Sequence, residues 1–397
     1  MKTKPAVLLA LALGLAPTGA GPAAAQTVSS RGYKGHESDR DITAFVNAYP
    51  RTVGTRLDDC QTCHRGGVFT ETRSGRTTTK NPCDYCHLVQ HPAPGLAGPA
   101  PADFHAPLNA YGLAYLAAGR SVAALRRIDR LDSDGDGARN GVEIAALRYP
   151  GDSTSRPGQP SAPARTFTAA ELRALPQRTE FVLVNASRQG GDFYATYSGV
   201  SVRDLLTAAG VDPDAPGFGG VTVVAPDGYV TDFTARQVAA AAAPGTFFAG
   251  LDSATLGACG FVRYPRPLPA GLVPGAPIPG EAWLLLASGR DGGAMDVTTL
   301  DPATGRLEGE GPFRLVVPPA APGAPDRGSS LGRTACNDGW DYDAAKDHNA
   351  GGMVRGVVAV RVNPLPAGVE DFDTRNGGWA FVANGSVVVY GAGVRAR

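Results

Sequence analysis

The chain has 397 residues, with 37 lysines and arginines against 37 aspartates and glutamates, so its formal net charge is +0. Without a basic excess or a basic block, nucleic acid is not expected as a partner. The length predicts two or more domains, and the 52 glycines and 33 prolines indicate many turns and loops.

The chain begins with the pattern of an export signal. Lys2 and Lys4 form a basic start, residues 6–16 are an apolar run, and residues 23–25 are a small-residue cleavage site. The apolar run is too short to cross a bilayer, and no later segment has the pattern of a transmembrane helix. We therefore predict that residues 1–25 are a signal peptide and that the mature chain lies in the periplasm or outside the cell. An uncleaved membrane anchor is the alternative.

Two Cys-x-x-Cys-His motifs follow, at residues 60–64 and 83–87. In this motif the two thiols attach a c-type haem, and the histidine ligates the haem iron. The sequence therefore predicts two covalently bound haems, held by Cys60, Cys63, His64, Cys83, Cys86 and His87. Paired Cys-x-x-Cys motifs at this spacing also occur in zinc sites, and exported thiol pairs form disulfides, so both alternatives stay open.

Each haem iron takes a sixth ligand or keeps an open position. Methionine is scarce: beyond the predicted signal peptide only Met295 and Met353 are present, both far from the motifs. Ligation by two histidines is therefore favoured. The candidates for the sixth position are His36, His91 and His105.

Residues 26–149 are predicted to form an irregular, mostly α-helical haem domain. Two short helices are expected at residues 42–48 and 108–118. Between them the chain is rich in glycine and proline, as at residues 91–101. A haem domain tolerates this composition because the haems supply much of its apolar core.

A twelve-residue stretch at residues 132–143 fits the calcium loop of an EF-hand. The position-6 glycine is Gly137, and the expected ligands are Asp132, Asp134, Asp136, the carbonyl of Ala138, Asn140 and the bidentate Glu143. Apolar residues predict a helix on each side, through Val122, Leu125 and Ile128 before the loop and Ile144 and Leu147 after it. The sequence thus predicts a Ca2+ site, and an acidic solvated turn is the alternative.

Residues 150–164 are rich in proline, serine and glycine and are predicted to be a linker. Beyond it, residues 165–397 are predicted to be a mixed α+β domain. Short helices are expected at residues 169–175 and 202–209. Strands are expected at residues 181–184, 221–224, 283–287, 313–317, 357–362 and 386–390.

Five segments of the second domain, at residues 167–176, 197–206, 223–229, 283–287 and 311–318, carry a family resemblance. In their order and spacing they resemble the molybdopterin-binding domain of the sulfite oxidase family, and the resemblance covers most of residues 165–365. It implies a sulfite-oxidase-like fold and a molybdenum centre that oxidises or reduces a small oxo-anion. Such a centre passes electrons one at a time to a haem, which fits a fusion with a dihaem domain.

The same family places a cysteine ligand to molybdenum just before the segment 197–206, where this chain has Val184, Asn185, Ala186 and Ser187. The remaining cysteines are Cys259 and Cys336, which are expected to form a disulfide in an oxidising compartment. A molybdopterin cofactor is therefore less favoured than the haems. The prediction is an exported dihaem cytochrome that carries electrons between redox partner proteins. The alternative is a molybdopterin-dependent oxidoreductase that uses the haems as its electron outlet.

Overall fold

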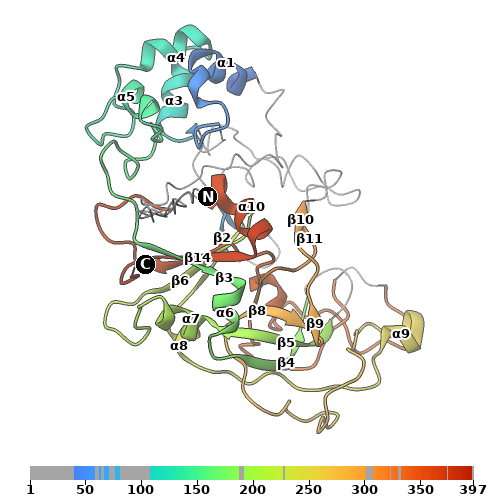
Figure 1. Ribbon diagram of the computed structural model, residues 1–397. Coiled ribbons are helices and arrows are strands. Elements are labelled where there is room, and N and C mark those ends of the chain that lie inside the picture. The colour runs from blue at the N-terminus through green and yellow to red at the C-terminus, as the bar shows by residue number, and fades with distance from the viewer. Residues whose placement is uncertain are drawn as a thin grey trace, which may run out of the picture.

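The computed structural model describes residues 40–58, 62–63, 67–70, 77–80, 108–186, 192–226, 229–300, 307–321, 323–329, 332–372 and 374–395. Figure 1 shows a group of helices at one end of the molecule and two layers of strands beyond it. We call residues 40–150 the helical part and residues 164–395 the sheet part. The segment between them joins the two.

Among its described residues, the helical part has the short helices α1 (Arg40–Ala48), α3 (Ala110–Ala117), α4 (Val122–Ile128) and α5 (Asn140–Ala145). The 3-10 turn η1 (Pro50–Thr52) follows α1. Side chains cap the N-termini of two of these helices. The Asn109 side chain accepts a hydrogen bond from the Gly112 N–H at the start of α3, and the Ser121 side chain accepts one from the Ala124 N–H at the start of α4. The helices pack around a largely aromatic core of Phe45, Tyr49, Leu57, Tyr111, Tyr115, Leu125, Ile128, Ile144 and Tyr149.

The structure confirms the helices expected at residues 42–48 and 108–118, as α1 and α3. Helices also flank the acidic loop as predicted, in the form of α4 and α5. Leu125 and Ile128 are buried, but Val122 is 39% exposed. The predicted helix is therefore present, and Val122 lies in its first turn, which faces solvent. The same half of the chain also contains a small antiparallel hairpin, β1 (Gly67–Thr70) with β2 (Thr77–Lys80). This hairpin lies away from the helices, beside the strands of the sheet part, where β2 contacts β7 (Val230–Phe233) (Figure 1).

Two five-stranded sheets build the sheet part. The first has the order β12-β8-β5-β4, with β9 paired to β8, and is antiparallel throughout. Its strands are β4 (Arg178–Val184), β5 (Phe193–Ser201), β8 (Leu285–Arg290), β9 (Gly293–Ala294) and β12 (Arg314–Val316).

The second sheet has the order β3-β14-β13-β6-β7, and only its β13–β14 pair is parallel. Its strands are β3 (Ala164–Thr168), β6 (Gly220–Val224), β7 (Val230–Phe233), β13 (Ala359–Asn363) and β14 (Ser386–Gly391). A two-residue ladder of β10 (Thr299–Leu300) and β11 (Leu307–Glu308) lies apart from both sheets.

The main core of the sheet part draws on strands of both sheets. It contains Phe167, Val200, Leu205, Val223, Leu286, Leu315, Val360 and Val389, among others. Alternate residues of β13 and β14, such as Ala359 and Val388, contribute to a second cluster with Val382 of helix α10 (Thr374–Asn384). Two-residue alternation of this kind is what a sheet covered on both faces requires.

Short helices fill the connections: α6 (Ala169–Arg173), α7 (Val202–Ala208), α8 (Ala235–Ala239), α9 (Ser253–Leu256) and α10 (Thr374–Asn384), with the 3-10 turns η3 (Gly257–Cys259) and η4 (Asn349–Gly352). Thr168 and Glu171 form a capping box at α6, and Thr234 and Gln237 form one at α8. The helices predicted at residues 169–175 and 202–209 are confirmed as α6 and α7. The described chain thus has helices and mixed sheets, as predicted for an α+β protein.

A buried carboxylate joins the two parts. Glu370 is 3% exposed and accepts from Arg56 Nη1 at 2.6 Å and from the Ser155 hydroxyl at 2.7 Å, and it also pairs with Arg148. Its backbone N–H donates to Pro160, and its carbonyl accepts from Ala162. The segment predicted to be a linker therefore packs closely at this junction, and Ser155, Gln159 and Ala162 in it are buried.

Across the residues described, no helix has the length and apolar character needed to span a membrane.

Candidate functional site

The acidic loop at residues 132–143 is held between the end of α4 and the start of α5. The Asn140 N–H donates to the carbonyl of Leu131, and the Gly141 N–H donates to that of Asp129. The Asn140 amide nitrogen donates to the Ile128 carbonyl at 2.8 Å. These bonds close the base of the loop, so both helices fix its position.

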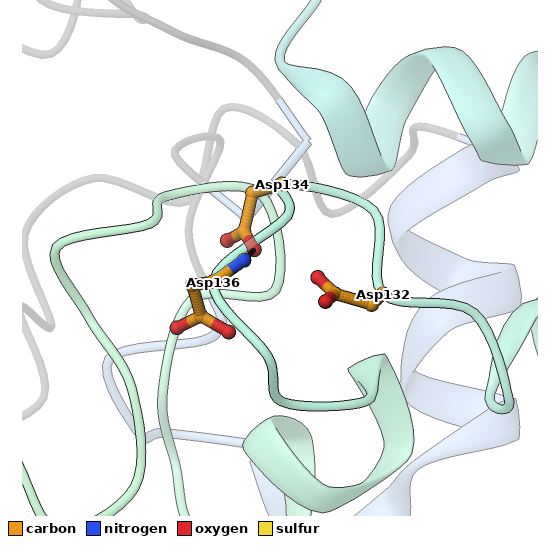
Figure 2. A group of neighbouring side chains, drawn as sticks. All are labelled: Asp132, Asp134 and Asp136. Atoms are coloured by element: carbon orange, nitrogen blue, oxygen red, sulfur yellow. Dashed lines mark hydrogen bonds between the residues drawn. The ribbon is translucent and has the colours of Figure 1, made fainter.

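Three aspartates of this loop gather their carboxylates in one place. Figure 2 shows Asp132, Asp134 and Asp136 as neighbours on a single turn of chain. One oxygen from each lies within 4.8 Å of the others. Backbone N–H groups orient them: Gly135 and Gly137 donate to Asp132 at 2.8 and 2.9 Å. Gly135 and Gly137 both have positive φ, as the tight turn requires.

Glu143 adds a fourth carboxylate from α5. It is 0% exposed, and neither of its oxygens has a hydrogen-bond partner among the described residues. Burial raises the pKa of Glu143 to about 8, and the charges of Asp134, Asp136 and Asp132 add to the effect. The pKa of Asp134 rises to about 6, first through burial and then through the charge of Asp136.

The two other predicted ligands of the loop have different surroundings. Asn140 is fully buried, and its side-chain oxygen accepts the N–H of Ser133 at 3.1 Å, while its amide nitrogen donates to the Ser133 hydroxyl at 2.9 Å. The Asn140 side chain thus ties the two ends of the loop together. The Ala138 N–H donates to Asp136 Oδ1 at 2.7 Å.

Of the six residues predicted to attach haem, only Cys63 is among the described residues. It is half-buried and packs against the aromatic core of the helical part. Its carbonyl accepts the N–H of Asn109 at 2.9 Å, and the Asn109 amide also donates to the carbonyl of Thr62. The start of α3 therefore fixes the backbone of the first motif.

A glycine makes this contact possible. A Cβ added at Gly112 would lie 2.1 Å from the carbonyl oxygen of Cys63, so only glycine lets α3 pack this closely. The position of Cys63 at the surface of the core fits a cofactor that is buried against aromatic side chains. Cys60, His64, Cys83, Cys86 and His87 lie outside the described residues, as do the candidate sixth ligands His36, His91 and His105.

The place where the resemblance puts a molybdenum thiolate is occupied by amides and carboxylates. Asn185 is buried, and its N–H donates to Asn349 Oδ1 at 2.8 Å. Nearby, Asp192 accepts the N–H groups of Ala186 and Asp326 at 2.9 Å each. Burial raises the pKa of Asp192 to about 7. Ser187 lies outside the described residues.

Cys259 and Cys336 form a disulfide, which confirms the predicted pairing. They are the only cysteines of residues 165–397. With both sulfurs in the disulfide, the sheet part has no thiolate left to ligate molybdenum. The residues present therefore do not fit that centre as the family builds it.

The junction around Glu370 was not predicted from the sequence. Arg56, Arg148 and Glu370 are isolated charges, the last more than 200 residues from the others, and no local pattern connects them. The burial of Glu143 was also not predicted, although its place as position 12 of the loop was.

Comparison with models of protein families, with curated proteins and with solved structures found no match for this chain. Its function is therefore inferred from its own residues and their geometry.

Proposed function

We propose that this chain is an exported c-type cytochrome that carries electrons between partner proteins through two haems bound to its helical part. The observation that carries the proposal is the pair of Cys-x-x-Cys-His motifs at residues 60–64 and 83–87. Zinc sites need no histidine after each thiol pair, so two such histidines favour haem over zinc.

Two structural features support the proposal. Cys63 is half-buried against aromatic side chains. A haem attached at this position would have apolar side chains beside it, as haems in small domains require. The Cys259–Cys336 disulfide is typical of an oxidising compartment outside the cytoplasm, which agrees with the signal-like start of the sequence.

In this proposal the first haem would be held by Cys60, Cys63 and His64, and the second by Cys83, Cys86 and His87. When bound, each haem would supply reversible one-electron transfer at its iron. The chain contributes attachment and the proximal imidazoles. Cys63 would attach the first haem next to the aromatic core that includes Tyr111 and Tyr115.

The test is iron and haem analysis of the full chain made in a host that attaches c-type haem and synthesises molybdopterin. We expect two haems per chain from the pyridine haemochrome spectrum. Removal of Cys60 and Cys63 together should halve that number, and so should removal of Cys83 and Cys86. A matched control, the exposed pair Thr154→Ala and Arg173→Ala, should leave it unchanged. Zinc without haem in the purified chain would refute the proposal.

A redox titration separates a carrier from an enzyme. Two reversible one-electron couples without turnover of small oxo-anions are expected for a carrier. The second candidate function, a molybdopterin-dependent oxidoreductase, rests on the resemblance of residues 165–365 to the sulfite oxidase family. Molybdenum near one per chain in the same metal analysis would favour it, and would require a protein ligand other than a thiolate.

A further inference from the structure

Three aspartate carboxylates meet on the loop between α4 and α5, and the carboxylate of Glu143 lies in the first turn of α5, directly after that loop. Asp132, Asp134 and Asp136 lie together (Figure 2). Asp134 Oδ2, Asp136 Oδ2 and both oxygens of Glu143 are buried and have no hydrogen-bond partner in the described chain. A buried carboxylate without a partner costs several kcal/mol unless a cation neutralises it.

Glu143 is the observation that separates this loop from an ordinary acidic turn. A turn exposed to water leaves its carboxylates solvated, whereas Glu143 is 0% exposed. It lies in the first turn of α5, and the N–H groups of Asn140 and Gly141 at the start of this helix bond to the base of the aspartate loop. Such an arrangement is unfavourable without a ligand and favourable around a cation.

The donor set selects the kind of cation. The converging side chains are all carboxylates, which suit a hard cation and not zinc or copper. Calcium binds six to eight oxygens at about 2.4 Å, so oxygens on opposite sides of the ion are about 5 Å apart. The aspartate oxygens lie within 4.8 Å of one another, which is a spread that calcium spans.

We propose that residues 132–143 bind one divalent cation of the calcium class, with Glu143 as the buried ligand that closes a cage begun by Asp132, Asp134 and Asp136. The proposal goes beyond electron transfer and does not depend on the haems. It uses only residues of the helical part and the charge that they place in one loop.

The position of the loop gives the bound cation a structural role. The Arg148 N–H donates to the carbonyl of Glu143 at 2.8 Å, and the Arg148 guanidinium pairs with Glu370 of the sheet part. On the other side, Arg156 Nη1 approaches the carbonyl of Asp136 at 3.5 Å. A cation that fixes Glu143 therefore also fixes Arg148 at the junction between the two parts.

The first test is calcium titration of the chelator-treated full chain by isothermal calorimetry, with magnesium as the comparison. The variants are Glu143→Gln and, as a second variant in the same cage, Asp134→Asn. We expect each to weaken calcium binding at least about tenfold, because the charge of the ligands sets the affinity of such loops. The control Glu308→Gln removes an exposed carboxylate on β11 and should bind calcium as the wild type does.

The second test compares the melting temperatures of Glu143→Gln and the wild type with and without calcium. Without calcium, Glu143→Gln should melt at a higher temperature than the wild type, because glutamine removes the free-energy cost of burying an ionisable carboxyl in the folded chain. With saturating calcium the order should reverse, because the wild type gains the binding free energy. Equal calcium affinity in the wild type and Glu143→Gln, or the same order of melting temperatures in both conditions, would overturn the proposal.

Hydrogen exchange tests the structural role. Calcium should slow the exchange of the Ala162 and Glu370 amides, which bond the connecting segment to the sheet part beside the Glu370 carboxylate, in the wild type and not in Glu143→Gln. Unchanged exchange at both amides would overturn the bracing role. Calcium binding by a chain that lacks haem would support the site while refuting the cytochrome, so the two proposals fail separately.

Discussion

Truncation of Glu370 to alanine should destabilise the protein far more than removal of a surface carboxylate. The carboxylate lies at the junction and receives Arg56 at 2.6 Å, the Ser155 hydroxyl at 2.7 Å and Arg148. Its side chain is 4% exposed. Removal takes away the carboxylate that the two arginines share. Burial lowers the pKa of Arg148, and the charge of Arg56 lowers it further.

The size of the effect follows from the burial of each partner. Loss of one member of a buried ion pair costs about 3–5 kcal/mol. The side chains of Arg56 and Arg148 are 14% and 21% exposed, so water reaches both and the lower end applies. We expect a loss of about 3 kcal/mol in the free energy of unfolding for Glu370→Ala. Arg56→Ala should cost about half of that, because Arg148 still neutralises the carboxylate.

The assay is urea unfolding of the calcium-saturated chain, followed by far-UV circular dichroism and by the fluorescence of the three tryptophans, all of which belong to the sheet part. Glu308→Ala on β11 is the matched control and should change stability by less than about 0.5 kcal/mol. If Glu370→Ala lowers the free energy of unfolding by less than about 1 kcal/mol, the effect is no larger than that of an exposed salt bridge. That result would refute the view that this contact joins the two parts.

Three further predictions concern a buried carboxyl, a close backbone contact and the disulfide. Burial raises the pKa of Glu180 to about 7. The folded state then keeps a proton that the unfolded chain loses, so stability should fall as pH rises from about 4.5 to about 7. Glu180→Gln should flatten this part of the pH profile of the melting temperature, whereas the exposed Glu281→Gln should not. Gly112→Ala should cost about 1–3 kcal/mol by thermal unfolding, because its Cβ meets the Cys63 carbonyl. Cys336→Ser opens a loop of 77 residues and should cost about 2–4 kcal/mol in urea unfolding.

Each of these has an outcome that contradicts it. An unchanged pH profile in Glu180→Gln would mean that Glu180 has, in the folded protein, a pKa close to that of an exposed glutamate. Wild-type stability of Gly112→Ala would mean that α3 and the first motif are not in contact. Equal stability of Cys336→Ser and of the wild type under oxidising conditions would mean that the disulfide does not constrain the unfolded chain.

The sequence by itself determined the features that depend on a few neighbouring residues. The acidic loop is one, because its ligand spacing, its glycines and its flanking helices all lie between residues 122 and 147. The helices α1, α3, α6 and α7 are others, since each has its own start signal or apolar periodicity. The motifs that predict haem are equally local, and their prediction awaits the metal analysis.

Strand limits were decided by pairing and not by composition. The apolar run predicted as a strand at residues 283–287 enters the ladder only at Leu285. Before it, the Trp283 N–H donates to the buried side chain of Glu180 and the Leu284 carbonyl accepts from Val202. The strand β5, the centre of the first sheet, was not predicted as a strand, because it mixes small, polar and aromatic residues and owes its burial to neighbours on both sides.

Only the tertiary structure decided which charges lose their water. Glu143 becomes a buried, unpartnered carboxylate within the described chain because α5 packs its face into the helical part. Glu370 becomes the centre of an ion cluster because Arg56, Arg148 and Ser155 reach it from more than 200 residues away. A local pattern specifies which groups a segment carries. The solvation of those groups, and therefore their need for a cation or an ion partner, is set by what the rest of the chain places around them.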